Sequence, residues 1–320
     1  MPRILIVAPN WIGDALLAQP LLARLHEKIP ALQLDVLAPE WVAAVLRRMP
    51  EVNEVIAVPF RHGALQLRSR WKVGRSLKAR GYQQAIVLPN TWKSALVPFF
   101  ADIPLRSGYV GESRYGLLNL LYKKNGAPMP LHYARLSEVP GRQVKEPLPT
   151  PLLEADPGDI EAVKRRFGVE GSYAVFCPGA EYGPAKRWPY FKELAATLAL
   201  QVVILGSTND EEAALGIRGK NLVGKTTLDE AIDLIAGAAY VVSNDSGLMH
   251  IAAALGRPQV ALFGSSSPVH TPPLSAAARV LWLRLECSPC FERVCPLGHF
   301  RCMRELAVET VVKEIQNLGA

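Results

Sequence analysis

Four residues that could contact an anionic ligand stand together in VSNDSGLMHIAAALG, residues 242–256. The apolar pattern predicts that a strand ends and a helix begins near Gly247. Ser246 and Gly247 would present free backbone amides at the helix start, where proteins commonly bind phosphate. His250 follows Ser246 by four residues and shares its helix face, where it either faces a ligand or packs in the core. Asp245 either caps the helix or turns to a hydroxyl of the ligand.

A second polar segment, CPGAEYGPAKRWP at residues 177–189, also follows a predicted strand. Gly179 and Ala180 are small enough to let a ligand approach the backbone closely. Lys186 and Arg187 could pair with phosphate oxygens, although a solvated basic loop would have the same composition. The segment contains neither GxxxxGK[ST] nor GxGxxG, so it predicts neither a P-loop nor a dinucleotide-binding turn.

Asp14 stands in a third segment, NWIGDALLAQPLL at residues 10–22, which follows the first predicted strand. At a helix start this carboxylate either caps the helix or faces a bound substrate. In the second case it could act as a general base and take a proton from an incoming hydroxyl. A fourth segment, LGSTNDEE at residues 205–212, is explained mainly as a capped helix start, with a weak indication of a ribose contact at Ser207.

Strand-like and helix-like segments alternate in both halves of the chain, which is typical of an α/β protein with parallel sheets covered by helices. In the first half we predict strands at 3–9, 32–39, 53–60 and 84–90, and helices at 14–28, 40–48, 63–80 and 93–100. In the second half we predict strands at 173–180, 201–207, 220–224, 240–246, 258–264 and 278–284, and helices at 191–200, 209–217, 227–238 and from about 247.

The segment 122–159 interrupts this alternation with many prolines, and its latter part predicts a linker because proline removes backbone donors. We therefore expect two doubly wound domains, 1–153 and 154–320. The amphipathic C-terminal segment 307–318 could pack back on the N-terminal domain. Ligands of doubly wound sheets bind beyond the carboxyl ends of the strands, so we expect an active cleft between the two domains.

The composition is that of a globular chain, with 49% apolar and 20% charged residues among 320. No window of about 18 uninterrupted apolar residues occurs, and the N-terminus lacks the pattern of a secretory signal, so we expect neither a membrane span nor a leader. The net charge of +7 favours an anionic partner. No basic stripe with interleaved aromatic residues and no zinc-finger spacing supports nucleic acid as that partner.

Taken together, these segments resemble the heptosyltransferases of lipopolysaccharide inner-core synthesis, glycosyltransferase family 9. The resemblance is carried by NWIGDALLAQPLL, FRHGALQL, LPNTWKSALVPFFADIPLRSGYVGESRYGLLN, FCPGAEYGPAKRWP, NDSGLMHIAAAL and SSSPVHTPPLS. These motifs extend from about residue 10 to residue 275, and the long central ones are specific.

The resemblance implies a GT-B fold, in which two Rossmann-like domains face a central cleft. It implies inverting transfer of L-glycero-D-manno-heptose from ADP-heptose to the first heptose of the Kdo2-lipid A inner core, with no metal or other cofactor. The N-terminal domain would bind the acceptor, and the C-terminal domain would bind the nucleotide sugar. Transfer of the first heptose, another ADP-sugar transferase and a GT-B-type nucleotide-sugar epimerase remain alternatives, as does a non-catalytic binding module.

By their place in these motifs, Asp14 is expected to be the catalytic base and Lys186 to stabilise the departing diphosphate. Expected donor contacts are Gly179, Ala180, Lys186, Arg187, Ser207, Thr227, Asp245, Ser246, Gly247 and His250. Expected acceptor contacts are Arg61, Asn90, Lys93, Arg106 and Arg114. The acceptor is itself anionic and lipid-linked, so the resemblance implies a cytoplasmic monomer that attaches peripherally to the inner membrane by surface charge.

Four cysteines near the C-terminus do not fit this account. Cys287, Cys290, Cys295 and Cys302 follow the spacing C-x₂-C-x₄-C-x₆-C. In a cytosolic chain such a group suggests a structural metal more than disulfides, but this spacing matches no established zinc or iron–sulfur signature. A structural metal site and reduced thiols both remain open.

Overall fold

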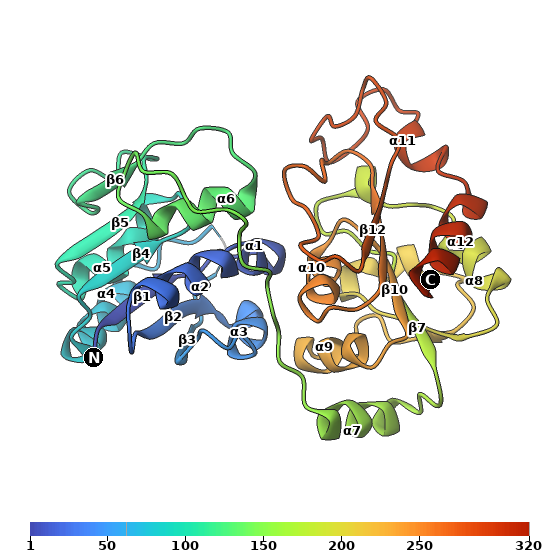
Figure 1. Ribbon diagram of the computed structural model, residues 1–320, viewed down its shortest axis with the longest axis horizontal. Coiled ribbons are helices and arrows are strands. Elements are labelled where there is room, and N and C mark those ends of the chain that lie inside the picture. The colour runs from blue at the N-terminus through green and yellow to red at the C-terminus, as the bar shows by residue number, and fades with distance from the viewer. Residues whose placement is uncertain (62, 320) are drawn as a thin grey trace. The chain divides into compact units, whose positions relative to one another are not determined.

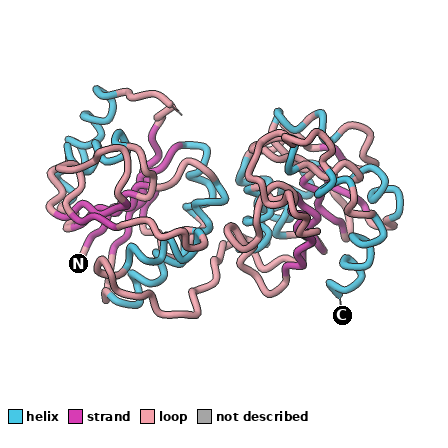
Figure 2. The backbone as a smooth tube through the Cα atoms, turned by 90° about the horizontal axis from the view of Figure 1, so that it is seen from above, coloured by secondary structure: helices cyan, strands magenta, loops and turns pink. Residues whose placement is uncertain are grey.

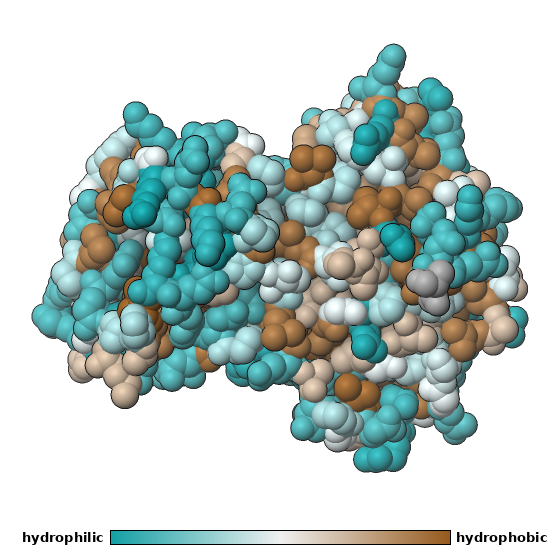
Figure 3. All heavy atoms as spheres, viewed as in Figure 1, coloured by the Kyte–Doolittle hydropathy of each residue, from teal (hydrophilic) through white to brown (hydrophobic). Residues whose placement is uncertain are grey.

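The computed structural model describes residues 1–61 and 63–319, which divide into two compact units, Met1–Thr150 and Pro151–Ala320 (Figure 1). Each unit is an α/β layer structure. The strands lie in the interior of each unit with helices and loops around them (Figure 2). On the visible face of the N-terminal unit, hydrophilic residues predominate and separate hydrophobic patches lie among them (Figure 3).

In the described part of the N-terminal unit, six parallel strands form a sheet in the order β3-β2-β1-β4-β5-β6. They are β1 (Arg3–Val7), β2 (Gln33–Pro39), β3 (Glu54–Val58), β4 (Gln84–Val87), β5 (Leu105–Tyr109) and β6 (Leu120–Tyr122). This is the doubly wound Rossmann order, in which the chain reverses direction across the sheet between β1 and β4. Because ligands of such sheets bind beyond the carboxyl ends at this reversal, the loops after β1 and β4 are the expected site.

Helices cover both faces of this sheet. They are α1 (Ile12–Leu17), α2 (Gln19–Lys28), α3 (Glu40–Arg47), α4 (Leu67–Leu77), α5 (Leu96–Phe100) and α6 (Met129–Ala134). The apolar faces of α4 and α5 pack on Leu5, Val7 and Val87 of the central strands. A Cβ on Gly74 would lie 2.5 Å from the Phe100 Cβ, so glycine is what allows α4 to pack this closely on α5.

The described part of the C-terminal unit repeats the same topology, with six parallel strands in the order β12-β11-β10-β7-β8-β9. They are β7 (Tyr173–Cys177), β8 (Gln201–Ile204), β9 (Lys220–Asn221), β10 (Tyr240–Asn244), β11 (Gln259–Phe263) and β12 (Ala278–Trp282). Here the chain reverses between β7 and β10. The segments 177–189 and 242–256, whose residues were expected to bind the donor, contain the ends of these two strands and the turns that follow them.

The helices of this unit are α7 (Pro157–Phe167), α8 (Phe191–Thr197), α9 (Leu228–Ala236), α10 (Gly247–Ala254), α11 (Arg301–Arg304) and α12 (Val308–Gln316). The apolar face of α12 packs within its own unit, on α8 and β11, with Val311 fully buried in the same core as Phe191. This packing makes α12 part of the core of the C-terminal unit, and the expectation that it also packs on the N-terminal domain stays a prediction.

One expectation about the helices was wrong. The predicted helix 14–28 is divided at Ala18, and α2 begins at Gln19 with Pro20 in its first turn, where proline lacks the amide that would continue α1. The proline-rich segment contains α6 in its first part, and only its last three residues belong to α7. Residues 138–156 between them form no helix or strand and contain the boundary between the two units, which agrees with the predicted linker. In α7, Asp156 caps the helix through a 2.7 Å bond from the Gly158 amide, and Pro157 occupies the first helical position, where proline is favoured. The short strands β5 and β6 were not predicted.

The other predicted strands and helices are present with small differences in their bounds, except that 209–217 forms only short 3-10 turns. The fold class is confirmed as α/β with two Rossmann-like doubly wound sheets. Among the helices in the described residues, none combines the length and apolar character needed to cross a bilayer.

Candidate active site

Side chains from three neighbouring strand ends of the C-terminal unit meet at one carboxylate. Asp245, which follows β10, is buried, and its Oδ2 lies 2.5 Å from Lys186 Nζ and 2.5 Å from Ser266 Oγ. Lys186 lies in the loop after β7, and Ser266 lies in the loop after β11. Asp245 therefore turns away from the amides of its own helix and holds a cation and a hydroxyl beside the carboxyl ends of the sheet.

The loop that carries Lys186 is held against the sheet by its neighbours. Asn244, fully buried at the end of β10, accepts a 3.1 Å hydrogen bond from the Trp188 amide and donates one of 2.7 Å to the Pro178 carbonyl. A Cβ on Gly264 would lie 2.9 Å from the Ala185 carbonyl oxygen. Glycine at this position lets the loop approach β11, and Asn244 joins both ends of the loop to β10. Lys186 is thus positioned by residues remote in sequence.

The amino end of α10 lies next to this carboxylate. Ser246 is the residue before the helix, and its side chain makes no capping bond to the helix amides, while its hydroxyl lies 3.2 Å from that of Ser243. Ser246 and Gly247 are both partly exposed. With no side-chain cap, these first amides can donate to a bound anion.

His250 does not extend this polar surface. It is only 6% exposed, and burial lowers its pKa to about 4, opposed by Asp245 and reinforced by Lys186. The imidazole is therefore neutral near pH 7 and brings no positive charge to a phosphate. His250 is thus a buried residue in the first turns of α10, as the core-packing alternative had it, and a contact with the ligand stays a prediction.

The small residues after β7 make room for a carboxylate of the protein. A Cβ on Gly179 would lie 2.1 Å from the Asp210 carboxyl carbon, and Ala180 is buried. Asp210 Oδ2 accepts bonds of 2.9 Å from both the amide and the hydroxyl of Ser207. Its other oxygen lies 3.7 Å from Arg187. Ser207 thus caps the short helical turn that follows it, which was the alternative to a ribose contact.

Thr227 also has a structural role. Its hydroxyl accepts the Glu230 amide at 3.2 Å, and Glu230 accepts the Thr227 amide at 2.8 Å, which is a reciprocal cap of α9. Just before it, GKNLVGKT at residues 219–226 matches the letters of a P-loop, GxxxxGK[ST]. Its middle residues form the edge strand β9 instead of a phosphate-binding loop. Neither feature adds to the site at the ends of β7, β10 and β11.

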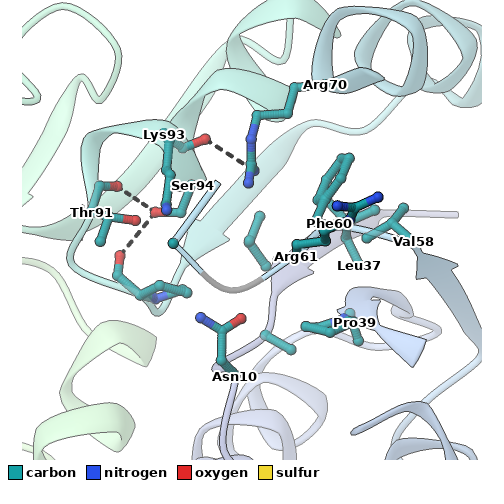
Figure 4. A pocket seen from close by; sticks show the side chains of 15 residues that line it. Asn10, Leu37, Pro39, Val58, Phe60, Arg61, Arg70, Thr91, Lys93 and Ser94 are labelled. Atoms are coloured by element: carbon teal, nitrogen blue, oxygen red, sulfur yellow. Dashed lines mark hydrogen bonds between the residues drawn. The ribbon is translucent and has the colours of Figure 1, made fainter. Parts of the chain in front are cut away.

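A pocket lies at the carboxyl edge of the N-terminal sheet (Figure 4). Its lining comes from the ends of β1 to β4 and the helix that follows β3: Val7, Ala8, Asn10, Leu37, Ala38, Pro39, Val58, Phe60, Arg61, Gly63, Arg70, Pro89, Thr91, Lys93 and Ser94. The pocket includes the β1–β4 reversal, where a doubly wound sheet is expected to bind its ligand. Arg61, Arg70 and Lys93 give it a positive charge suited to an anionic ligand.

Asp14 lies in the first turn of α1, directly after β1. It is the third residue of the helix and partly exposed, while Trp11 occupies the capping position. Asp14 is therefore not the N-cap residue itself, and the helix dipole favours a carboxylate in this turn. α6 packs against α1, and burial together with the Asp14 charge raises the pKa of Tyr133 on α6 well above 10. The Asp14 carboxylate is thus near the Tyr133 phenol.

Two arginines expected to contact the acceptor instead donate hydrogen bonds to backbone carbonyls of the protein. Arg114 is 2% exposed, donates to the carbonyls of Pro89 at 2.5 Å and Tyr109 at 2.6 Å, and has its pKa lowered to about 10 by burial. Arg106 donates to the Leu117 carbonyl at 2.7 Å and to two further carbonyls. Both hold loops together, so we do not keep them as ligand contacts.

The three other expected acceptor contacts differ in position. Arg61 is exposed and lines the pocket, and its amide donates to Gln66 at 2.7 Å. Lys93 lines the pocket from the loop after β4, and its carbonyl accepts Arg70 at 3.2 Å. Asn90 is outside the pocket lining, and its buried Oδ1 has no hydrogen-bond partner among the described residues.

Four residues of these sites were not identified from the sequence: Asn10, Arg70, Asn244 and Ser266. Asn244 and Ser266 stand inside quoted motifs, NDSGLMHIAAAL and SSSPVHTPPLS, where their position near the end of a predicted strand was the available signal. Arg70 is nearly buried, bonded to the Leu65 carbonyl at 2.7 Å and 4.3 Å from the Phe60 ring centre. In the sequence it is one of several arginines in a basic helix, so nothing distinguishes it.

The four C-terminal cysteines are free thiols. Burial and the nearby Cys287, Cys290 and Cys295 raise the pKa of Cys302, so the four are in the same neighbourhood. Within residues 1–61 and 63–319, however, no group of three or more His, Cys, Asp or Glu side chains is arranged to hold a metal ion. The possible structural metal site is therefore not formed by this arrangement.

Comparison with known proteins agrees with the fold and with the motifs. The model of glycosyltransferase family 9 (heptosyltransferase) matches residues 70–301. Lipopolysaccharide heptosyltransferase 2 of Escherichia coli K12 is 45% identical, with 88% of each chain covered. Lipopolysaccharide heptosyltransferase 2 of Salmonella typhimurium LT2 is 41% identical, with 99% of this chain and 98% of the relative covered.

A solved structure is similar over the whole chain. The structure of E. coli ADP-heptose LPS heptosyltransferase II has a TM-score of 0.88 and 40% identity, and covers 99% of this chain and 98% of its own. The family resemblance and the GT-B fold expected from the motifs are both confirmed. This chain is a glycosyltransferase and belongs to glycosyltransferase family 9, the heptosyltransferases.

Proposed function

We propose that this enzyme transfers L-glycero-D-manno-heptose, with inversion, from ADP-heptose to the first heptose of the Kdo2-lipid A inner core. The observation that carries the proposal is the meeting of Lys186, Asp245 and the uncapped amino end of α10 at the reversal of the second sheet. A cation and free amides together suit a diphosphate, and Asp245 suits a sugar hydroxyl. Relatives named heptosyltransferase 2, at 41 to 45% identity, support this donor and acceptor.

The C-terminal unit would bind the donor. Lys186 and the amides of Ser246 and Gly247 would neutralise the charge that develops on ADP as it departs. Asp245 would hold Lys186 in place and accept a hydroxyl of the heptose. Arg187 is partly occupied by Asp210, so we assign it a supporting electrostatic role.

The N-terminal unit would bind the acceptor in the pocket at the ends of β1 to β4. Arg61, Arg70 and Lys93 would offset the charge of the anionic inner core. The Asp14 carboxylate would take the proton of the acceptor hydroxyl as its oxygen attacks the anomeric carbon of heptose. The bond from that carbon to the ADP oxygen would break with its electron pair, which leaves ADP and an inverted glycosidic bond. Nearby Tyr133 would help to fix the orientation of the carboxylate.

The acceptor is lipid-linked, so we further propose that the enzyme works at the cytoplasmic face of the inner membrane as a peripheral protein. Surface cations near the acceptor pocket would hold it to anionic lipid head groups. An epimerase would need no second substrate, and the cationic pocket in the N-terminal unit would then have no use.

The test is incubation of the purified enzyme with ADP-heptose and two defined acceptors, Kdo2-lipid A with and without its first heptose. We expect one heptose to be added to the heptosylated acceptor, measured as a mass increase, and the linkage to be read by NMR. Product on the acceptor without heptose would show transfer of the first heptose instead. Release of a modified sugar nucleotide with no acceptor product would favour the epimerase.

A further inference from the structure

The outward face of α4 combines exposed apolar side chains with cations. Leu67 and Trp71 are one helical turn apart and are 48% and 51% exposed. Arg68 and Lys72 lie beside them on the same side of the helix and are also exposed. Neither cation forms an ion pair with the described residues, whereas Arg75 and Lys78 further along share Asp102. We call Leu67, Arg68, Trp71 and Lys72 the α4 outer face.

The adjoining buried side of α4 fixes the direction in which this outer face points. Arg70 and Gly74 belong to that side, one turn from Leu67 and Trp71 respectively, and Gly74 packs directly on Phe100 of α5. Arg70 binds the Leu65 and Lys93 carbonyls, at 2.7 and 3.2 Å. α4 therefore cannot rotate to bury Leu67 and Trp71 without losing these contacts. Single exposed apolar residues are common, but a row of two beside unpaired cations is the pattern of helices that lie on membrane surfaces.

The α4 outer face also borders the proposed acceptor pocket. Arg70, from the first turn of the same helix, lines that pocket together with Arg61 from the preceding loop (Figure 4). A lipid-linked acceptor has its sugar in the enzyme and its acyl chains in the bilayer. A membrane-binding surface beside the pocket would keep the acyl chains in the lipid while the sugar reaches the pocket.

From this juxtaposition we propose that the α4 outer face docks on an anionic phospholipid bilayer. Leu67 and Trp71 enter the boundary between head groups and acyl chains, and Arg68 and Lys72 pair with lipid phosphates. The purpose of this contact rests on the proposed function, since it presumes a lipid-linked acceptor. The contact itself does not, because it depends only on the exposed residues of one helix.

The first test is co-sedimentation with vesicles of phosphatidylcholine containing phosphatidylglycerol, compared with vesicles of phosphatidylcholine alone. We expect binding to the anionic vesicles that weakens as salt is added. Since each cation near such a surface contributes about five-fold in binding, the pair Arg68→Gln and Lys72→Gln should reduce it by about twenty-fold or more. The matched control is Lys123→Gln with Lys124→Gln, two exposed lysines of the same unit.

The apolar pair is tested by Leu67→Ser with Trp71→Ser, and the control is Leu215→Ser, a more exposed leucine of the other unit at 73%. We expect the first variant to lose most vesicle binding and the control to retain it. The proposal would be overturned if the Arg68/Lys72 variant and the Lys123/Lys124 control lost vesicle binding equally. It would also be overturned if vesicle binding were unchanged in both α4 variants. A change of oligomeric state in the Leu67–Trp71 variant, with vesicle binding unchanged, would assign this face to a second copy of the chain and would also overturn it.

Activity separates failure of this inference from failure of the proposed function. With a deacylated, water-soluble acceptor, the α4 variants should transfer heptose like the wild type, because none of the four residues lines the pocket. With the same acceptor anchored in anionic vesicles, their transfer should fall about ten-fold or more in line with lost binding. If the protein binds vesicles through α4 but transfers heptose to neither acceptor, the membrane-binding inference stands and the proposed function is refuted.

Discussion

The ammonium of Lys186 lies 2.5 Å from Oδ2 of Asp245. Both side chains are largely shielded from water, and the same oxygen accepts Ser266 Oγ. Because the two opposite charges offset each other at this distance, the pair leaves the lysine without surplus charge. A donor diphosphate would therefore share Lys186 with Asp245 instead of meeting a free cation, and Asp245 fixes where that shared cation lies.

Replacement of Lys186 by alanine should weaken ADP binding and slow transfer. Because loss of one group that stabilises transition-state charge typically costs about 10²–10³-fold in kcat, we expect a fall in that range. Calorimetry with ADP and steady-state kinetics would measure the two effects. The matched control is Lys192→Ala, an exposed lysine on α8, which should behave as wild type. Unchanged kinetics in Lys186→Ala would remove this residue from the donor site.

Replacement of Asp14 by asparagine should leave ADP-heptose binding intact while transfer falls by about 10²–10⁴-fold, the usual contribution of a general base. Asparagine keeps the shape of the side chain but cannot take the proton of the acceptor. Donor binding by calorimetry and single-turnover transfer would separate binding from chemistry. Near wild-type turnover in this variant would refute the base assignment.

His250 predicts a loss of stability in acid. Burial lowers its pKa in the folded protein to about 4, from the ordinary 6.5, so the unfolded chain binds a proton more readily. The contribution to stability is complete above pH 6.5 and is lost as the pH falls toward 4. The free energy of unfolding should therefore fall by about 2 kcal/mol between pH 7 and pH 5.

This loss should be absent in His250→Gln, which has no proton to bind. Urea unfolding of the two proteins at pH 7 and pH 5 would compare their pH dependence. NMR titration of the His250 ring gives a direct control. A ring that titrates near pH 6.5 would contradict the assignment of a buried, neutral imidazole.

Replacement of Arg114 by methionine should destabilise the N-terminal unit by about 3 kcal/mol, because buried carbonyls of Pro89 and Tyr109 lose their donor. The loop after β4, which carries Lys93, should loosen as a result. We therefore expect a lower Tm by calorimetry and a higher KM for the acceptor, with the KM for the donor unchanged. Lys123→Met, an exposed control, should change none of these. A raised KM with an unchanged Tm would mean that Arg114 contacts the acceptor directly.

Much of the fold could be predicted from the sequence, because hydrophobic periodicity is local. Apolar runs within residues 3–9 and 173–180 marked central strands, and polar residues after them marked the ends where ligands bind. The elements that were missed are short or unusual. β6 has three residues, α7 begins at a proline, and α6 lies in the proline-rich segment 122–159, where no helix pattern was recognised. In these cases tertiary packing outweighs the local signal.

The sequence by itself determined the α/β class, the family and the segments that carry chemistry, because these depend on residue types and their spacing. Only the tertiary structure decided what each charged side chain binds. Arg114 and Lys186 are both basic residues in family motifs, yet one is enclosed by backbone carbonyls and the other meets Asp245. The difference arises because the sheet order places β7 beside β10 and β4 beside β5, and burial and distance follow from those neighbours.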